Sequence, residues 1–234
     1  MPAIGFSTGA LFKDQLARGV DLLRQLNLTT VELSALRLRE LPALIDFVDK
    51  TDLSYFTYVS LHAPTDFLPE QEKSVAALLL AVALEKRWRV VLHPDCIKDV
   101  EAWRPFGDLL CIENMDKRKN AGRTVGELEA VFADLPLAQL CFDIAHARQV
   151  DTTMTEAYRV LKRFRSRIVQ IHMSEVTSAS THDRISDAAV ASFREVAAFL
   201  PDVPVIVESP VTSDRANAEV EQAAKVFAPV LAHA

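Results

Sequence analysis

Phe142-Asp143-Ile144-Ala145-His146 lies between a short apolar run, residues 140–142, and a stretch with helical periodicity, residues 153–165. An acid at the end of a strand, followed three residues later by a histidine, places two potential metal ligands where the strand passes into a loop. The same pattern, an apolar run that ends in His, Glu or Asp, recurs along the chain. Its recurrence is what predicts the fold.

Short β-type runs alternate with longer helical ones. Eight runs have strand character: residues 4–7, 30–34, 58–61, 89–92, 109–112, 140–142, 168–171 and 205–207. Seven segments have helical character, namely residues 13–26, 38–49, 70–86, 124–133, 153–165, 186–199 and 214–231, and a short eighth helix is expected within residues 97–106, which Pro105 interrupts. Eight βα units close a (β/α)8 barrel, so we predict a single α/β domain, a TIM barrel, over residues 1–234. An open doubly wound sheet is disfavoured because Gly5 and Gly9 do not make a dinucleotide-binding turn.

The composition is typical of a globular protein, with 50% hydrophobic and 25% charged residues. The net charge of -6 predicts no basic surface for nucleic acid. Three cysteines, two of them inside apolar runs, suit a reducing cytoplasm. The N-terminus lacks a signal-peptide pattern, and the longest apolar run, residues 75–84, is about half of the ~20 residues that a membrane span needs. We therefore expect a cytoplasmic protein with neither a membrane nor nucleic acid as its partner.

In a barrel of this kind, residues at the C-terminal ends of the strands face one shared mouth. A lone histidine at a strand end is usually structural. Here, however, five of the six histidines fall at strand ends or just beyond, and only His233 lies in the tail. The third to eighth runs end in side chains suited to metal binding or acid–base chemistry, and the loop after the seventh adds one more: His62, His93, Glu113, Asp143 with His146, His172, His182 and Glu208.

Carboxylates and imidazoles gathered at one mouth repel and desolvate one another unless a cation lies between them. One or more divalent metal ions per chain are the simplest compensation. Mixed oxygen and nitrogen ligands suit Mn, Zn, Co, Fe or Mg.

The order of these residues on successive strands resembles the xylose-isomerase-like barrel superfamily, which contains sugar isomerases and epimerases and the endonuclease IV branch. The similarity extends from Val31-Glu32-Leu33 to Val207-Glu208-Ser209. Resemblance to the epimerases implies a metal held by four residues, Glu113, Asp143, His172 and Glu208, with the two glutamates exchanging the substrate proton. Resemblance to the endonucleases implies further metal-binding roles for four histidines, His62, His93, His146 and His182. Ser180 stands where that branch has an aspartate, and the adjacent Asp183 is a substitute of different geometry.

Three functions follow as alternatives. The expected one is a divalent-metal-dependent isomerase or epimerase that acts on a small sugar or sugar phosphate through an ene-diolate, with Glu113 and Glu208 as base and acid. His146 would then orient a substrate oxygen, and Arg184 would stabilise negative charge. The second is an endonuclease IV-like phosphodiester hydrolase acting on abasic DNA, which the extra histidines favour and the acidic charge disfavours. The third is a metal-containing barrel that binds without turnover.

Two further features bear on partners. A basic cluster, Lys117-Arg118-Lys119 with Arg123, follows Glu113 and is compatible with a sugar phosphate or with a solvated loop. Apolar residues on helix faces are compatible with a homodimer.

Overall fold

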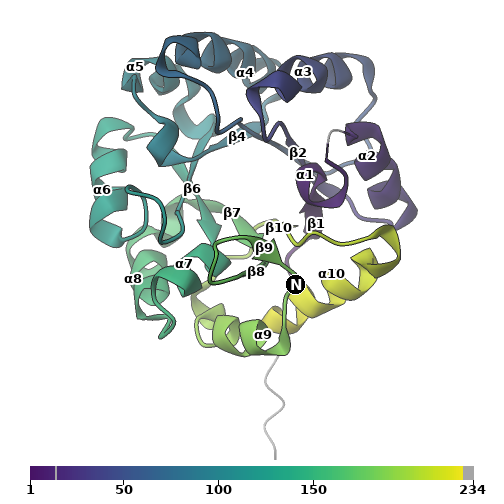
Figure 1. Ribbon diagram of the computed structural model, residues 1–234, viewed down its shortest axis with the longest axis vertical. Coiled ribbons are helices and arrows are strands. Elements are labelled where there is room, and N and C mark those ends of the chain that lie inside the picture. Colours follow the sequence, from purple (N-terminus) through teal and green to yellow (C-terminus); the bar gives the residue numbers. More distant parts are fainter. Residues whose placement is uncertain (14, 229–234) are drawn as a thin grey trace, which may run out of the picture.

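The computed structural model describes residues 1–13 and 15–228 of the chain. Eight parallel strands form a closed barrel in the order β1-β10-β7-β6-β5-β4-β3-β2, with β1 paired to both β10 and β2 (Figure 1). The predicted (β/α)8 barrel is therefore confirmed. The strands are β1 (Ile4–Ser7), β2 (Thr30–Ser34), β3 (Tyr58–His62), β4 (Arg89–Leu92), β5 (Leu110–Glu113), β6 (Gln139–Asp143), β7 (Ile168–Met173) and β10 (Val205–Val207).

Helices surround this barrel on the outside (Figure 1). Those that match predicted segments are α2 (Leu16–Gln25), α3 (Leu41–Lys50), α4 (Glu72–Lys86), α6 (Val125–Asp134), α8 (Thr155–Phe164), α9 (Asp187–Arg194) and α10 (Ala216–Ala224). The eighth predicted helix is α5 (Val100–Trp103), which a 3₁₀ helix, Arg104–Leu109, continues. The last predicted helix was expected to reach residue 231, and its residues 229–231 lie outside the described part of the chain.

Four short elements were not predicted. They are the helices α1 (Thr8–Leu11) and α7 (Ile144–Val150) and the strands β8 (Glu175–Val176) and β9 (His182–Asp183), which pair as an antiparallel hairpin. α1 and α7 follow directly after β1 and β6, so they begin at the mouth of the barrel. Over residues 1–13 and 15–228, no helix has both the length and the apolar character to cross a bilayer.

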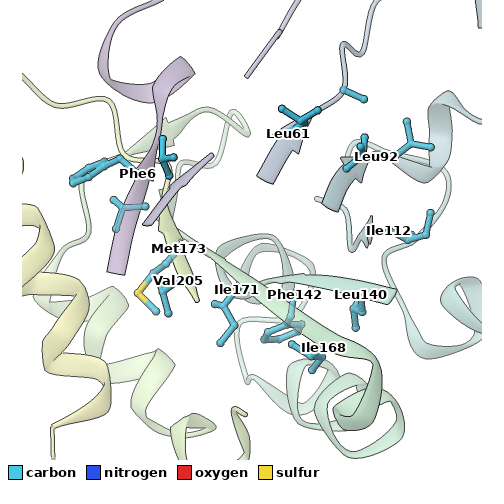
Figure 2. Packing of buried hydrophobic residues seen from close by; sticks show 14 of the residues in the cluster. Phe6, Leu61, Leu92, Ile112, Leu140, Phe142, Ile168, Ile171, Met173 and Val205 are labelled. Atoms are coloured by element: carbon cyan, nitrogen blue, oxygen red, sulfur yellow. The ribbon is translucent and has the colours of Figure 1, made fainter. Parts of the chain in front are cut away.

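The main apolar core lies between the strands and the helices. Leu61, Leu92 and Phe142 on the strands belong to one buried cluster with helix residues such as Leu79 and Leu161 (Figure 2). Because side chains alternate along a strand, the intervening residues face the inside of the barrel. That interior holds a small separate cluster of Val91, Cys111 and Cys141.

The alternation also explains why the functional residues share one mouth. On each of these strands a residue in the middle faces the barrel interior. The residue two positions later faces the same way and lies at the C-terminal end of the strand. The pairs of lower and upper inward residues are Ser60 and His62, Val91 and His93, Cys111 and Glu113, Cys141 and Asp143, Gln170 and His172, and Ile206 and Glu208. The upper layer of the barrel interior is thus made of imidazoles and carboxylates.

Candidate metal centre

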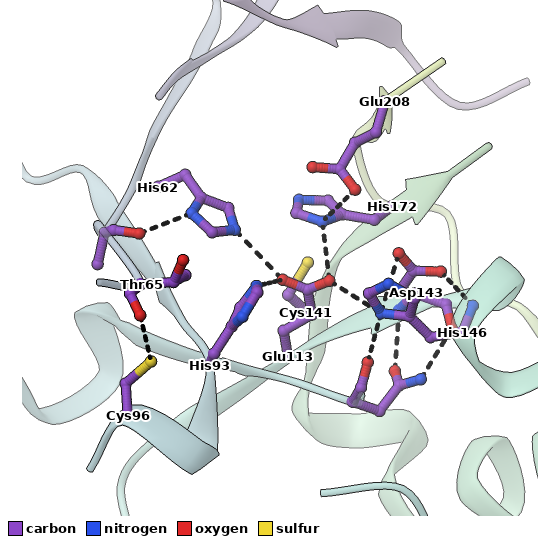
Figure 3. Close-up of polar contacts among 12 residues, drawn as sticks. His62, Thr65, His93, Cys96, Glu113, Cys141, Asp143, His146, His172 and Glu208 are labelled. Atoms are coloured by element: carbon purple, nitrogen blue, oxygen red, sulfur yellow. Dashed lines mark hydrogen bonds and ion pairs between the residues drawn. The ribbon is translucent and has the colours of Figure 1, made fainter. Parts of the chain in front are cut away.

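A cavity of about 1050 Å³ opens at the mouth of the barrel. Its lining includes six of the predicted site residues, His62, His93, Glu113, His146, His182 and Glu208. The two others, Asp143 and His172, are buried with no exposed surface and lie next to this lining (Figure 3). All eight residues predicted as metal ligands are therefore gathered in one region.

Glu113 lies at the centre of the group and uses its two carboxylate oxygens differently (Figure 3). Its Oε2 lies 3.3 Å from His62 Nε2 and 3.2 Å from His93 Nε2. Its Oε1 lies 3.2 Å from His146 Nδ1 and 3.5 Å from His172 Nδ1. One side of the carboxylate faces β3 and β4, and the other faces β6 and β7.

Among the described residues, three sets of side chains are arranged closely enough to hold a metal ion, and two of these sets include Glu113. In each set, every residue offers one ligand atom, and these atoms lie within 4.8 Å of one another. The first set is His62, His93 and Glu113, and the second is Glu113, Asp143, His172 and Glu208. Glu113 is the residue that these two sets share.

Two atoms of the second set are buried without any hydrogen bond, namely Asp143 Oδ2 and His172 Nδ1. A buried polar atom left without a hydrogen bond costs about 1–3 kcal/mol, so such atoms are uncommon unless they serve a ligand. Both atoms belong to a set of oxygen and nitrogen donors without thiolate, which is the chemistry that divalent Mn, Zn, Co or Fe accepts. The residues present therefore fit a divalent ion.

Neighbouring groups hold these ligands in place. The Asn114 side chain accepts the backbone N–H of Asp143 and donates to its backbone oxygen, each at 2.8 Å. Asp143 Oδ1 accepts the backbone N–H of His146 at 2.7 Å and caps α7, which leaves Oδ2 turned to the centre. His62 Nδ1 lies 2.9 Å from the backbone oxygen of Ala63, so its Nε2 is the nitrogen directed at Glu113.

Burial and neighbouring charges shift the pKa values of the site residues. Burial alone would lower the pKa of His62 and His146, but the hydrogen bond and charge of Glu113, together with Asp143 beside His146, raise these pKa values to about 9 and about 10. For Glu208, burial acts to raise the pKa, yet His172 brings it down to about 2. Burial raises the pKa of Asp143 to about 6, so its charge is the least well compensated. A cation near Asp143 Oδ2 would supply that compensation.

A third metal position beside His146 and His182 is less complete. The two rings lie in edge contact with centroids 5.5 Å apart. Ser180, at φ 54°, forms the tip of the β8–β9 hairpin, and its Oγ accepts Gln149 Nε2 at 2.6 Å. Asp183 is exposed and accepts the backbone N–H of Arg184. In the described part of the chain, neither histidine joins a set of three ligands close enough for an ion.

Several solved structures share the fold of this chain. No protein-family model and no curated protein matches the chain. Among solved structures, endonuclease IV from Thermus thermophilus is similar with a TM-score of 0.63 and 22% identity, covering 97% of each chain. A xylose isomerase domain protein from Alicyclobacillus acidocaldarius gives 0.66 and 13%, over 96% of this chain and 98% of that one. An L-ribulose 3-epimerase gives 0.58 and 12%, over 97% and 92%.

The chain has the same (β/α)8 barrel fold as these structures. Its structural neighbours include endonucleases, sugar epimerases and a probable dehydratase. At 12–22% identity, the likeness extends to the fold and does not choose between these activities.

Arg184 lies away from the cavity, whereas two residues of the basic cluster line it. Arg184 Nε lies 3.8 Å from Glu219 Oε2, and Arg184 is not part of the cavity lining. Arg118 and Lys119 do line the cavity, where they pair with Asp116 and Asp95 respectively. Arg37, which lies outside the cluster, also lines the cavity, so positive charge at the mouth comes from these residues and not from Arg184.

The structure adds Glu32 to the candidate site. Glu32 is completely buried on β2 and forms a third set of potential ligands with His62 and Glu208. We had not predicted a role for it. The available signal was a charged residue between Val31 and Leu33, because an acid within an apolar strand run must face something other than the apolar core.

Proposed function

We propose that this barrel is a divalent-metal-dependent hydrolase of phosphate esters with at least two ions per chain. The observation that carries the proposal is the position of Glu113, whose two oxygens face separate groups of ligands. Pairs of metal ions about 3.5–4 Å apart, bridged by shared ligands, are typical of enzymes that displace groups at phosphorus. An isomerase with a single ion would not need His62 and His93 as metal ligands.

In this proposal His62, His93 and Glu113 hold one ion, and Glu113, Asp143, His172 and Glu208 hold the other. Bound divalent ions lower the pKa of water and neutralise charge on a phosphoryl group. The chain contributes the geometry. Its buried carboxylates are fixed by Asn114 and by the start of α7, and the contact with Ala63 keeps the ring of His62 turned so that Nε2 is directed at the ion.

The cavity suggests a compact substrate. Its wall carries Arg37, Arg118 and Lys119, which offer positive charge to a phosphate above the acidic floor. The chain as a whole has a net charge of -6, and a protein that grips duplex DNA along its backbone needs many Lys and Arg contacts. We therefore favour a small phosphate ester, such as a sugar phosphate or a short phosphodiester, over a duplex.

Isomerisation or epimerisation of a small sugar is the second candidate. It is favoured by one observation, that Glu113 Oε1 and Glu208 Oε2 approach the same atom, His172 Nδ1, at 3.5 and 3.3 Å. Two glutamates on different strands beside one ion are suited to remove and return a proton on a carbon between them. This candidate leaves the contacts of Glu113 Oε2 with His62 and His93 without a purpose.

Metal content and reaction type separate the two candidates. Purified protein is analysed for divalent ions, then assayed for hydrolysis of bis-p-nitrophenyl phosphate and of sugar phosphates, for nicking of an abasic duplex, and for solvent deuterium entering a panel of ketoses. We expect about two ions per chain and hydrolysis of a phosphate ester without exchange. His93→Gln should remove one ion and abolish hydrolysis. One ion per chain with deuterium exchange that survives His93→Gln would overturn the proposal in favour of an isomerase.

A further inference from the structure

The inside of the barrel below the metal centre is polar on the side formed by β2, β3 and β7. Interiors of such barrels are usually filled by branched apolar side chains. Here Glu32, Ser60 and Gln170 all lie there with no exposed surface. An unpaired carboxylate in such a place costs several kcal/mol, so its surroundings must compensate it.

Three donors gather at one oxygen of Glu32. Ser60 Oγ donates to Oε2 at 3.2 Å, Gln170 Nε2 donates at 2.7 Å, and His172 Nε2 lies at 3.1 Å. Gln170 Nε2 also lies 2.7 Å from His172 Nε2, and it donates its second N–H toward Cys141 Sγ at 3.7 Å. Glu32 Oε1 makes no hydrogen bond. The carboxylate is therefore held through Oε2, and its one charged or chargeable neighbour among these donors is His172.

Tyr58 sets the direction of the Gln170 amide. Its hydroxyl donates to Gln170 Oε1 at 2.6 Å, which turns the amide nitrogen toward Glu32. Burial raises the pKa of Tyr58 well above its ordinary value, so the phenol keeps its proton and remains a donor. Tyr58 therefore donates a hydrogen bond to Gln170, and Gln170 in turn donates one to Glu32.

His172 stands between this network and the ligands. Its Nε2 is directed at Glu32, whereas its Nδ1 lies 3.5 Å from Glu113 Oε1 and 3.3 Å from Glu208 Oε2 and makes no hydrogen bond. An imidazole that binds an ion through Nδ1 must carry its proton on Nε2. A carboxylate that accepts this Nε2–H fixes the tautomer and the ring and makes Nδ1 a stronger ligand.

We propose that Glu32 is a positioning residue for the metal centre, which acts by accepting the Nε2–H of His172 and holding Nδ1 toward the ion. The inference rests on the proposed metal centre. Glu32 also forms a set with His62 and Glu208, but His62 has only Nε2 to offer, and that atom faces Glu113. Glu32 therefore acts through His172 and is not itself a ligand.

The isosteric change Glu32→Gln tests this role by calorimetric titration of metal-stripped protein with Zn²⁺. Loss of a partner behind a metal-bound histidine typically weakens affinity 10–100-fold, and we expect a loss in roughly this range with the number of ions per chain unchanged. Glu72→Gln is the matched control. Glu72 is equally buried on α4, where it accepts Trp103 Nε1 at 2.8 Å and two backbone N–H groups, so its change should lower stability and leave Zn²⁺ affinity as it is.

A second measurement observes His172 directly. In Zn²⁺-loaded wild-type protein with ¹⁵N-labelled histidine, His172 should show a protonated Nε2 and a metal-bound Nδ1, and the Nε2–H proton should move upfield in Glu32→Gln. The inference is overturned by a bare Nε2, by unchanged Zn²⁺ affinity, or by the loss of one whole ion, which would make Glu32 a ligand. A wild-type protein that binds no Zn²⁺ would instead overturn the proposed function.

Discussion

Asp143 accepts the backbone N–H of His146 at 2.7 Å through Oδ1, while its Oδ2 lies 3.3 Å from the ring nitrogen Nδ1 of the same histidine. The Asp143 carboxylate thus caps the start of α7 with one oxygen and faces the metal centre with the other. The helix start and the ligand geometry cannot vary independently, because both depend on the same side-chain rotamer.

Substitutions at Asp143 should separate these two tasks. Asparagine can still cap a helix but lacks the ligand charge, whereas alanine loses both, and loss of a cap costs about 1 kcal/mol. Burial raises the pKa of Asp143 to about 6, so at about pH 8 the metal-free wild type carries an unfavourable charge that Asn removes. We expect Asp143→Asn to be at least as stable as the wild type in EDTA at that pH, and Asp143→Ala to be about 1 kcal/mol less stable than Asp143→Asn. Urea unfolding measures both, and equal stability of the two variants would contradict the capping role.

The metal-free protein should lose stability as the pH rises from neutral into the alkaline range. The folded-state pKa values of His62 and His146, about 9 and about 10, lie above the ordinary 6.5. Their contribution to stability is complete below about pH 6.5 and is lost as the pH rises through about 9 and about 10. Burial also raises the pKa of Cys111 to about 12, which adds to the loss at alkaline pH. Unfolding of Zn²⁺-loaded protein is the control, because His62 is then a neutral ligand and its share of the pH dependence should disappear, while the effects of His146 and Cys111 remain.

Metal binding should release protons near neutral pH. His62 must be neutral to bind an ion, yet the contact with Glu113 keeps it protonated in the metal-free protein at about pH 7.5. Apparent affinity should rise up to about tenfold per pH unit for each proton released. Titration calorimetry in buffers of different ionisation enthalpy counts the protons. Binding heats that do not depend on the buffer would argue against His62 as a ligand.

Arg184→Ala tests the role that the sequence suggests for this side chain, which is to stabilise negative charge during the reaction. Arg184 is exposed and its guanidinium approaches Glu219, so we expect its removal to change metal content and turnover by less than about twofold. Lys119→Ala is the informative comparison, since Lys119 lines the cavity, and it should raise KM for a phosphate ester. A large loss of turnover in Arg184→Ala would restore Arg184 to the site.

Two glycines should respond in opposite ways to alanine. A Cβ at Gly5 on β1 would overlap the backbone oxygen of Thr30 on β2, so Gly5→Ala should cost more than about 3 kcal/mol or prevent folding. A Cβ at Gly126 in α6 would meet nothing within 4 Å, and Gly126→Ala should stabilise by about 0.5–1 kcal/mol. Thermal unfolding compares the two, and a soluble, stable Gly5→Ala protein would show that the β1–β2 spacing can adjust.

The repeating pattern of the sequence was enough to predict the barrel and its mouth. Strands such as Arg89–Leu92 coincide with the predicted runs because an apolar segment bounded by charged or turn residues has few other stable arrangements. The position of His93 or Glu113 at the mouth follows from the strand that it ends. Topology then brings together residues that lie far apart in the chain.

Other features depend on contacts that no local pattern contains. The helix α7 was not predicted because it is short and its start depends on the Asp143 cap, and the β8–β9 hairpin depends on Ser180 adopting positive φ. Arg184 lies near His182 in sequence, but the hairpin turns its side chain to Glu219. The role inferred for Glu32 rests on contacts with Gln170 and His172, 138 and 140 positions away.

These long-range contacts inside the barrel also bear on how the chain folds. Glu32 on β2 accepts Ser60 on β3, but its other partners, and the partner of Tyr58 on β3, lie on β7, 112 to 140 positions later. A nascent first half of the chain therefore lacks most of the contacts that compensate this buried carboxylate and phenol. Contacts of such sequence separation make folding slow, on the scale of milliseconds to seconds or longer. The same polar contacts that serve the metal centre therefore delay completion of the barrel interior until β7 is in place.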